Sequence, residues 1–259
     1  MAERMKLRVL PVVKAYPEPS EKYGATVCVV GVTVPEGRWV RLYPIRFMEL
    51  PKDKRFKKYQ IIEAVVAKSH NDPRPETYQI NEETIQVVGQ PIGTGGNWSE
   101  RKRLLADASV VSLCELQRLQ KVERASLGMV RVREVTRFRT VEADEDKYTK
   151  AEKKYEYAAT ADLFNESKLK VEPLPFKYQY WFRCMEDACN GHRCSIIDWE
   201  AYELHRKMVS RWGKKKRLIK SSRNTLTTYA DPTKRHVSSW GTCCDTPTLS
   251  SFLVRSILS

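Results

Sequence analysis

The stretch Thr26-Val-Cys-Val-Val-Gly-Val-Thr-Val-Pro-Glu-Gly-Arg-Trp-Val-Arg-Leu-Tyr-Pro44 decides how the first half of this chain folds. Two runs rich in β-branched and aromatic residues flank a Pro/Gly turn, a pattern that predicts a β-hairpin. In the second run, one face carries Trp39, Arg41 and Tyr43, and Arg38 lies on the other. An arginine between two rings can stack with bases and contact phosphates, so these four residues are candidates for nucleic-acid binding. A solvated sheet face with aromatic residues at its edge gives the same pattern.

A basic loop follows the hairpin. It reads Pro51-Lys-Asp-Lys-Arg-Phe-Lys-Lys-Tyr59 and leads into a predicted strand over residues 60–67. Basic side chains interleaved with rings are what single-stranded nucleic acid contacts. The binding candidates in this loop are therefore Lys54, Arg55, Lys57, Lys58 and Tyr59. The alternative is a solvated loop.

The next loop, Ser69-His-Asn-Asp-Pro-Arg-Pro-Glu76, is stiffened by two prolines. It places Asp72, Arg74 and Glu76 close together. Such a loop suits an active site or a phosphate pocket, with Arg74 as the phosphate contact. A turn whose charges pair locally explains the same residues.

The middle of the chain predicts one helix and one long strand. Apolar residues recur at helical spacing over 98–125, and residues 129–141 alternate as a strand whose four arginines can form a stripe. Residues 142–156 are almost wholly charged, which is typical of a linker or an exposed helix. We therefore expect a domain boundary near residue 148, between a β-rich domain over 1–148 and a second domain over 149–259.

Three of the seven cysteines and one of the four histidines lie within eleven residues. They form a C-x4-C-x2-H-x-C array, which predicts a tetrahedral zinc site with no open position, hence a structural ion. The predicted ligands are Cys184, Cys189, His192 and Cys194. A redox-active cluster, a disulfide, and cysteines that merely pack are the alternatives. The strand before the array and Ser195-Ile-Ile197 after it predict a zinc ribbon.

The cysteines also bear on the compartment. Their odd number argues against a disulfide framework, and residues 1–13 do not read as a signal peptide. The longest nearly uncharged apolar run, residues 26–34, is about half of what a membrane span needs. We therefore expect a cytoplasmic protein with no membrane partner. Cys243 and Cys244 are alternative thiolate ligands or play no role.

A helix is predicted directly after the cysteine array, beginning at Asp198-Trp-Glu200. Asp198 is suited to cap it, and Glu200 stands in the first turn, where the helix dipole favours an anion. Gly213 is a typical helix end. The basic run that follows is a candidate phosphate-contact surface made of Lys214, Lys215, Lys216 and Arg217.

Four segments together resemble an uncharacterised family of bacterial hypothetical proteins. They are Trp39-Val-Arg-Leu-Tyr-Pro44, Phe56-Lys-Lys-Tyr59, Asp72-Pro-Arg-Pro-Glu76 and the cysteine array with its Asp-Trp-Glu helix. The resemblance covers most of the chain and implies no activity. From residue 230 onward the sequence departs from the pattern, so the role of residues 230–259 is unassigned. The expected fold is α+β: a small N-terminal β-sheet or barrel-like domain with a helical segment, then a zinc-ribbon-like domain with a long helix.

The charge favours one class of function. With 46 basic and 32 acidic residues the net charge is +14, which attracts polyanions such as nucleic acid. The favoured function is a non-catalytic nucleic-acid-binding subunit of a bacterial defence, mobile-element or RNA-guided complex, with DNA or RNA and other protein subunits as partners. One alternative is a nuclease that holds Mg²⁺ with Asp72, Glu76, Asp198 or Glu200. Another is a zinc-stabilised adaptor that binds protein. No complete catalytic motif is present in the sequence, which favours the first class.

Overall fold

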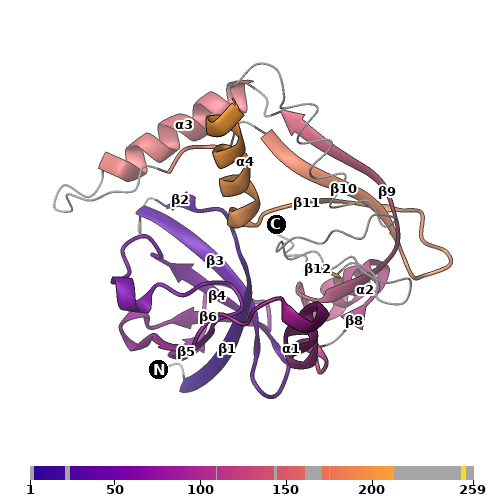
Figure 1. Cartoon of the computed structure of the whole chain (residues 1–259), viewed down its shortest axis with the longest axis horizontal. Coiled ribbons are helices and arrows are strands. Elements are labelled where there is room, and N and C mark those ends of the chain that lie inside the picture. Colours follow the sequence, from indigo (N-terminus) through magenta and orange to yellow (C-terminus); the bar gives the residue numbers. More distant parts are fainter. Residues whose placement is uncertain are drawn as a thin grey trace. The chain divides into compact units, whose positions relative to one another are not determined.

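The computed structural model describes residues 3–20, 24–108, 110–142, 145–160, 171–174, 176–212 and 252–254. The chain is α+β, and its contacts divide it into two units (Figure 1). Unit 1 comprises residues 1–109 and 143–175, and unit 2 comprises residues 110–142 and 176–259. Each unit is therefore built from two separate stretches of chain.

Unit 1 is mainly β-structure. Its strands are β1 (Arg4–Lys14), β2 (Glu18–Ser20), β3 (Gly24–Thr33), β4 (Trp39–Ile45), β5 (Ile61–Lys68), β6 (Thr77–Ile80) and β7 (Gln86–Val88). The helices are the short η1 (Lys52–Lys54) and η2 (Glu82–Thr84), and α1 (Gly95–Leu105) and α3 (Glu145–Thr160). The predicted hairpin is confirmed, because β3 and β4 pair antiparallel. Gly37 in its turn has φ +66°, and an added Cβ would lie 2.7 Å from the backbone of Asp107, so only glycine fits there.

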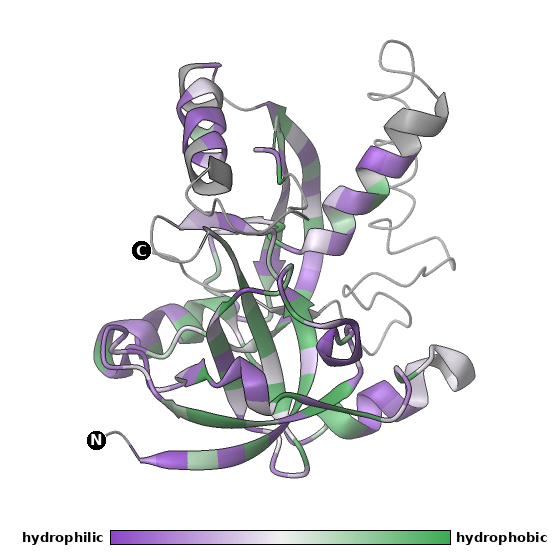
Figure 2. Ribbon diagram, turned by 90° about the vertical axis from the view of Figure 1, so that its left-hand side faces the viewer, coloured by the Kyte–Doolittle hydropathy of each residue, from purple (hydrophilic) through white to green (hydrophobic). Residues whose placement is uncertain are grey.

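Five of these strands close into a barrel in the order β1-β3-β4-β6-β5, and β1 also pairs with β5. β1 closes the ring because Arg4 to Val9 pair with β5 and Val9 to Lys14 pair with β3. The pairing with β3 is interrupted by a bulge between Pro11 and Val13. β4 and β6 are parallel, whereas the other pairs are antiparallel. This connectivity is that of the OB-fold barrel. Hydrophobic residues lie along these strands (Figure 2), and the fully buried ones include Val27, Leu42, Ile45 and Ile62.

The single helix predicted over 98–125 is instead two helices. α1 ends at Leu105, and α2 (Leu113–Glu123) begins after the two-residue strand β8 (Val110–Val111). The break has two local causes. The β-branched pair in β8 forms a parallel bridge with β9 (Met129–Glu142). Ser112 then caps α2 by accepting a hydrogen bond from the backbone N–H of Glu115 at 2.9 Å.

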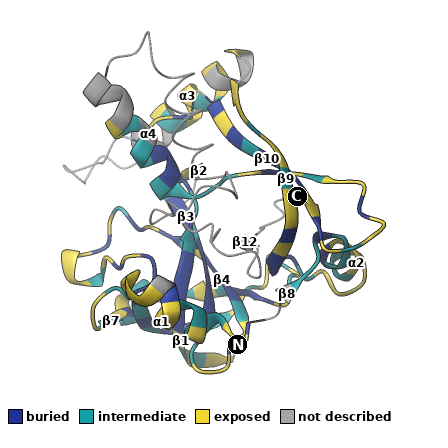
Figure 3. Cartoon of the chain, turned by 45° about the vertical axis from the view of Figure 1, so that its right-hand side comes forward, coloured by how far each residue is buried: buried dark blue, intermediate teal, exposed yellow. Residues whose placement is uncertain are grey.

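Unit 2 contains a sheet in the order β11-β10-β9-β12, with β8 added beside β9. Its remaining elements are β10 (Phe176–Cys184), β11 (His192–Ser195), α4 (Trp199–Trp212) and β12 (Phe252–Val254). Buried and more exposed residues alternate along β10 (Figure 3). One face of the sheet packs with Leu113 and Leu116 of α2 in a single hydrophobic core that includes Val130, Val132, Tyr180 and Phe182.

The boundary expected near residue 148 does not separate the units. Residues 110–142 belong with the C-terminal stretch because β9 pairs with β10 along almost all of its length. The charged segment after β9 forms the exposed helix α3, which belongs to unit 1. There the Tyr155 hydroxyl donates to the Pro17 carbonyl at 2.7 Å. Sequence periodicity does not reveal that the chain alternates between the two units, because strand pairing depends on residues far apart in the chain.

Within the described ranges, no helix combines the length and the apolar character that crossing a bilayer requires. The basic run Lys214–Arg217, Cys243, Cys244 and most of the segment 230–259 lie outside the described residues.

Candidate metal centre and basic sheet face

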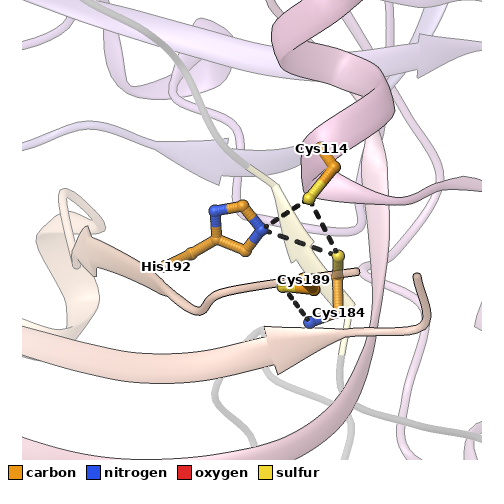
Figure 4. A group of neighbouring side chains, drawn as sticks. All are labelled: Cys114, Cys184, Cys189 and His192. Atoms are coloured by element: carbon orange, nitrogen blue, oxygen red, sulfur yellow. Dashed lines mark hydrogen bonds between the residues drawn. The ribbon is translucent and has the colours of Figure 1, made fainter. Parts of the chain in front are cut away.

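Four side chains of unit 2 form a cluster: Cys114, Cys184, Cys189 and His192 (Figure 4). Their sulfur and nitrogen atoms all lie within 4.8 Å of one another. The Cys114 and Cys184 sulfurs are 3.7 Å apart, and each lies 3.3–3.5 Å from Nε2 of His192. Two thiolates at the usual zinc–sulfur distance in a tetrahedral site are separated by about 3.8 Å. Cys114, Cys184 and His192 therefore have the spacing that a tetrahedral ion requires, and the Cys189 sulfur lies within 4.8 Å of the other three ligand atoms.

Three elements bring these ligands together. Cys184 ends β10, Cys189 lies in the turn after it, and His192 begins β11. Gly191, with φ +98°, lets the chain reverse between the last two. Cys114 comes from the first turn of α2, so an ion would connect this helix to the β10–β11 hairpin.

A second layer of contacts supports the same arrangement. Glu186, in the turn of the hairpin, accepts a hydrogen bond from the Ser112 hydroxyl at 2.6 Å and pairs with Arg118 of α2 at 2.6 Å. The backbone N–H of Cys184 lies 3.4 Å from the Cys189 sulfur, to which it donates. These contacts hold the hairpin turn against the start of α2.

The thiols of Cys114 and Cys184, which face each other, differ in acidity. Burial and the neighbouring sulfurs raise the pKa of Cys114 to about 12. Burial would also raise the pKa of Cys184, but hydrogen bonds from the backbone N–H groups of Cys114 and Glu186 and from His192 lower it to about 6. The site thus stabilises at least one thiolate near neutral pH, which is the form that binds a metal.

The fourth member of the cluster differs from the predicted one. Cys184, Cys189 and His192 are brought together as expected, whereas Cys114 stands where Cys194 was predicted. Cys194 lies opposite Tyr180 and is 6% exposed within the hydrophobic core. It is two residues beyond His192 on the same strand face, roughly 6.6 Å farther along β11. No signal in the sequence pointed to Cys114, because no local spacing links it to residues seventy positions away.

In the barrel, the hairpin and the proline-rich loop meet. β4 runs parallel to β6, and the backbone N–H of Arg41 donates to the Glu76 carbonyl at 2.8 Å. Arg41 is 0% exposed. It is therefore not available at the surface for the predicted stacking with bases. Its Nη1 lies 4.0 Å from the Asp72 carboxylate. The alternation of β4 is as predicted, but its outward arginine is covered.

The charges of the proline-rich loop pair with one another. Arg74 donates from Nε and Nη2 to the two carboxylate oxygens of Asp72. Burial alone would raise the pKa of Asp72, but these hydrogen bonds and the charge of Arg74 lower it to about 2. Glu76 is 7% exposed. This agrees with the interpretation of the loop as a locally paired turn.

The other two acidic candidates lie in unit 2, at the start of α4. The Asp198 carboxylate accepts a hydrogen bond from the backbone N–H of Glu200 at 3.0 Å, and Glu200 stands in the first turn of the helix. Both therefore have the structural role expected of residues that begin a helix.

The basic loop 51–59 is only partly buried, and its Arg55 and Lys57 are exposed. Lys58 and Tyr59 are buried, and the Tyr59 ring is 3.8 Å from the Arg101 guanidinium. Lys54 and Arg55 donate to backbone carbonyls of Glu83, Leu50 and Met48. Besides Lys54, Arg55 and the Asp72-paired Arg74, the predicted binding residues of unit 1 with exposed or partly exposed side chains are Arg38, Trp39, Tyr43 and Lys57.

A larger basic surface lies on the face of the unit 2 sheet that is opposite the hydrophobic core. We call it the basic sheet face and define it by Arg131, Arg133, Arg137, Arg139, Lys177, Arg183, Arg193 and the partly exposed Trp181. All seven basic residues are exposed. Within the described part of the chain, only Arg133 and Arg183 of this set form ion pairs, with Asp187 and Glu134. The sequence predicted the arginines of β9 as a stripe. Trp181 and Arg193 lie beside this stripe because of how β9, β10 and β11 are paired, which the sequence pattern does not show.

The chain matches two family models. Residues 5–107 match a domain of unknown function (DUF8758), and residues 108–259 match a domain of unknown function (DUF8757). The division between the matches lies beside the first boundary between the structural units, after residue 109. No curated protein matches the chain.

Proposed function

The chain belongs to the family described as a domain of unknown function (DUF8757), and from its geometry we propose that it binds nucleic acid on a sheet stabilised by a structural zinc ion. The observation that carries the proposal is the basic sheet face. Seven basic side chains from three strands share one surface of unit 2, and all seven are exposed. Such a surface neutralises phosphates and releases their counterions.

Zinc has a defined place in this proposal. A set of three cysteines and one histidine is typical of structural zinc, because all four positions of a tetrahedral ion are taken by the protein. The ligands stand on strands whose opposite face is the basic one, since Cys184 ends β10 and His192 begins β11. The ion would keep these strands in register with α2. In this sense the β10–β11 hairpin acts as a zinc ribbon within a larger sheet.

The barrel supports the proposal by analogy only. OB-fold barrels commonly bind single strands and oligonucleotides, although a fold does not by itself define a function. The exposed residues Arg38, Trp39, Tyr43 and Lys57 are candidates for additional contacts there.

We favour a binding subunit over a nuclease. Asp72 is neutralised by Arg74, and Asp198 caps a helix, so these carboxylates already have partners. The role we propose is a non-catalytic subunit of a bacterial defence, mobile-element or RNA-guided complex. Reduced metal-binding thiols fit the cytoplasm, where disulfides are rare.

Salt-dependent binding tests the proposal. We expect the full-length, zinc-loaded protein to bind a labelled oligonucleotide with an affinity that falls steeply as salt rises. Replacing Arg131, Arg139 and Arg193 together by alanine should reduce the steepness of log Kd against log salt by about 2–3, because each lost phosphate contact removes about 0.7–0.9.

The matched control removes the same charge from unit 1. The variant Lys150→Ala/Lys153→Ala/Lys154→Ala changes three exposed lysines of α3 and should leave the salt dependence unchanged. Fluorescence anisotropy titrations at roughly 50 to 300 mM salt would measure the salt dependence of Kd for both triple variants. An affinity that does not respond to salt, or equal losses in both triple variants, contradicts the proposal.

A further inference from the structure

We infer that the basic sheet face takes single-stranded rather than double-stranded nucleic acid, with one base stacked on Trp181. This inference rests on the proposed function and specifies the ligand of the same surface. It is carried by the position of one aromatic ring among the arginines, a feature that charge alone does not explain.

Trp181 lies in the middle of a row that crosses three strands. On β10 it is directly opposite Arg193 of β11 on one side and Arg137 of β9 on the other. Neighbouring strands are about 4.8 Å apart, so a cation stands on each side of the indole at about that spacing. The Arg137 guanidinium is 6.0 Å from the ring centroid, at the outer limit of a cation–π contact. The two arginines are thus suited to hold the phosphates on either side of a base on the ring.

The next row along the strands is polar. Gln179 of β10 lies between Arg139 and Ser195, and its amide nitrogen donates to the Ser195 hydroxyl at 3.2 Å. It is two residues from Trp181 on the same face, roughly 6.7 Å away. An amide, a hydroxyl and a third arginine can therefore meet the edge and the phosphate of an adjacent nucleotide.

This arrangement suits a single strand for two physical reasons. Only an unpaired, unstacked base has a free ring face to place on an indole, whereas the bases of a duplex stack on each other. In addition, the major groove of DNA admits a helix or a two-stranded ribbon, and the basic sheet face spans β9, β10 and β11. A sheet of this width does not fit the regular major groove, so on an undistorted duplex its contacts would be mainly with phosphates.

The experiment compares single-stranded and duplex oligonucleotides of the same length at one salt concentration, using the full-length, zinc-loaded protein. We expect the single strand to bind more tightly. Trp181→Ala should weaken single-strand binding by about 10-fold or more, and Trp181→Phe by much less, because a ring is kept. Neither change should alter the salt dependence, since no phosphate contact is removed.

Two controls keep the result interpretable. Gln179→Ala changes the same face of the same strand without removing a ring, and should cost less affinity than Trp181→Ala. The zinc content and melting temperature of each variant verify that the sheet is intact.

Different results would contradict the proposed function and this inference. If the protein binds no oligonucleotide, the proposed function is wrong and the inference with it. If binding is salt-dependent but the duplex binds as well as the single strand, or Trp181→Ala binds single strands as the unaltered protein does, the inference alone is overturned.

Discussion

At the residue scale, the cluster shows how strand geometry decides which cysteine and histidine side chains come together. His192 and Cys194 both lie on the core-facing side of β11, yet only His192 stands beside the end of β10. Cys194 is carried away from the cluster by two residues of extended chain and packs in the core. The position left open is filled by Cys114 from the first turn of α2, and the backbone N–H of Cys114 helps to stabilise the thiolate of Cys184.

This leads to a prediction that separates the two cysteines. Cys114→Ser should weaken zinc binding by more than about 100-fold, because loss of a ligand costs more than loss of a supporting contact. Cys194→Ser should keep one zinc per chain and lower stability by about 1 kcal/mol as a buried substitution. Elemental analysis after dialysis and thermal melting measure both effects. Zinc lost from Cys194→Ser and retained by Cys114→Ser would reverse the assignment.

At the element scale, β3 packs unusually tightly against β1 in the barrel. It lies between β1 and β4 and approaches β1 so closely that Gly31 has no room for a side chain. A Cβ on Gly31 would lie 2.5 Å from the Leu10 carbonyl oxygen and 2.8 Å from a methyl group of Val9. The carbonyl belongs to the backbone and cannot rotate away, so a larger residue would force the two strands apart.

Gly31→Ala should therefore destabilise unit 1 by about 1–3 kcal/mol, the usual cost of overpacking. Gly95→Ala is the matched control, because nothing lies within 4 Å of a Cβ at that position and Gly95 stands at the start of α1. Alanine favours the helix over glycine, so this change should be neutral or slightly stabilising. Urea unfolding compares the two variants. Equal stability of both would mean that the strands accommodate the methyl group freely.

At the scale of the whole molecule, the chain passes between two units three times. The Cys/His cluster lies entirely in unit 2, where it connects α2 with the β10–β11 hairpin. Unit 1 has its own barrel core and contains none of the four clustered residues. The stabilising effect of the ion should consequently be confined to one unit.

Removal of zinc tests this division. A strong chelator should lower the melting temperature of one calorimetric transition by more than about 10 °C, because structural zinc contributes many kcal/mol to the domain that it holds. The second transition, assigned to the barrel, should remain. Gly31→Ala should shift that second transition instead and thereby identify it. A single transition that moves as a whole on chelation would indicate that the units unfold together.

Much of the secondary structure followed from local pattern. The alternation of residues 26–44 predicted the hairpin, and Asp198 correctly predicted the start of α4. The predicted helix over 98–125 was wrong at Ala106–Ser112, where two valines pair with β9 instead. Apolar spacing alone cannot distinguish these cases, because a short β-branched run between helices becomes a strand only when a partner strand lies beside it.

By itself, the amino-acid sequence determined which residue types meet in the hairpin turn of unit 2, three of the five barrel strands (β3, β4 and β5) and the strong positive charge, because these depend on neighbours within a few positions. Tertiary structure alone decided that Cys114 completes the cluster, that Arg41 is buried beside Asp72, and that Trp181 lies between two arginines. Each of these depends on strand register or on a helix packing across many residues of chain. Pairings of that kind are chosen by the burial of the whole core and leave no mark in local spacing.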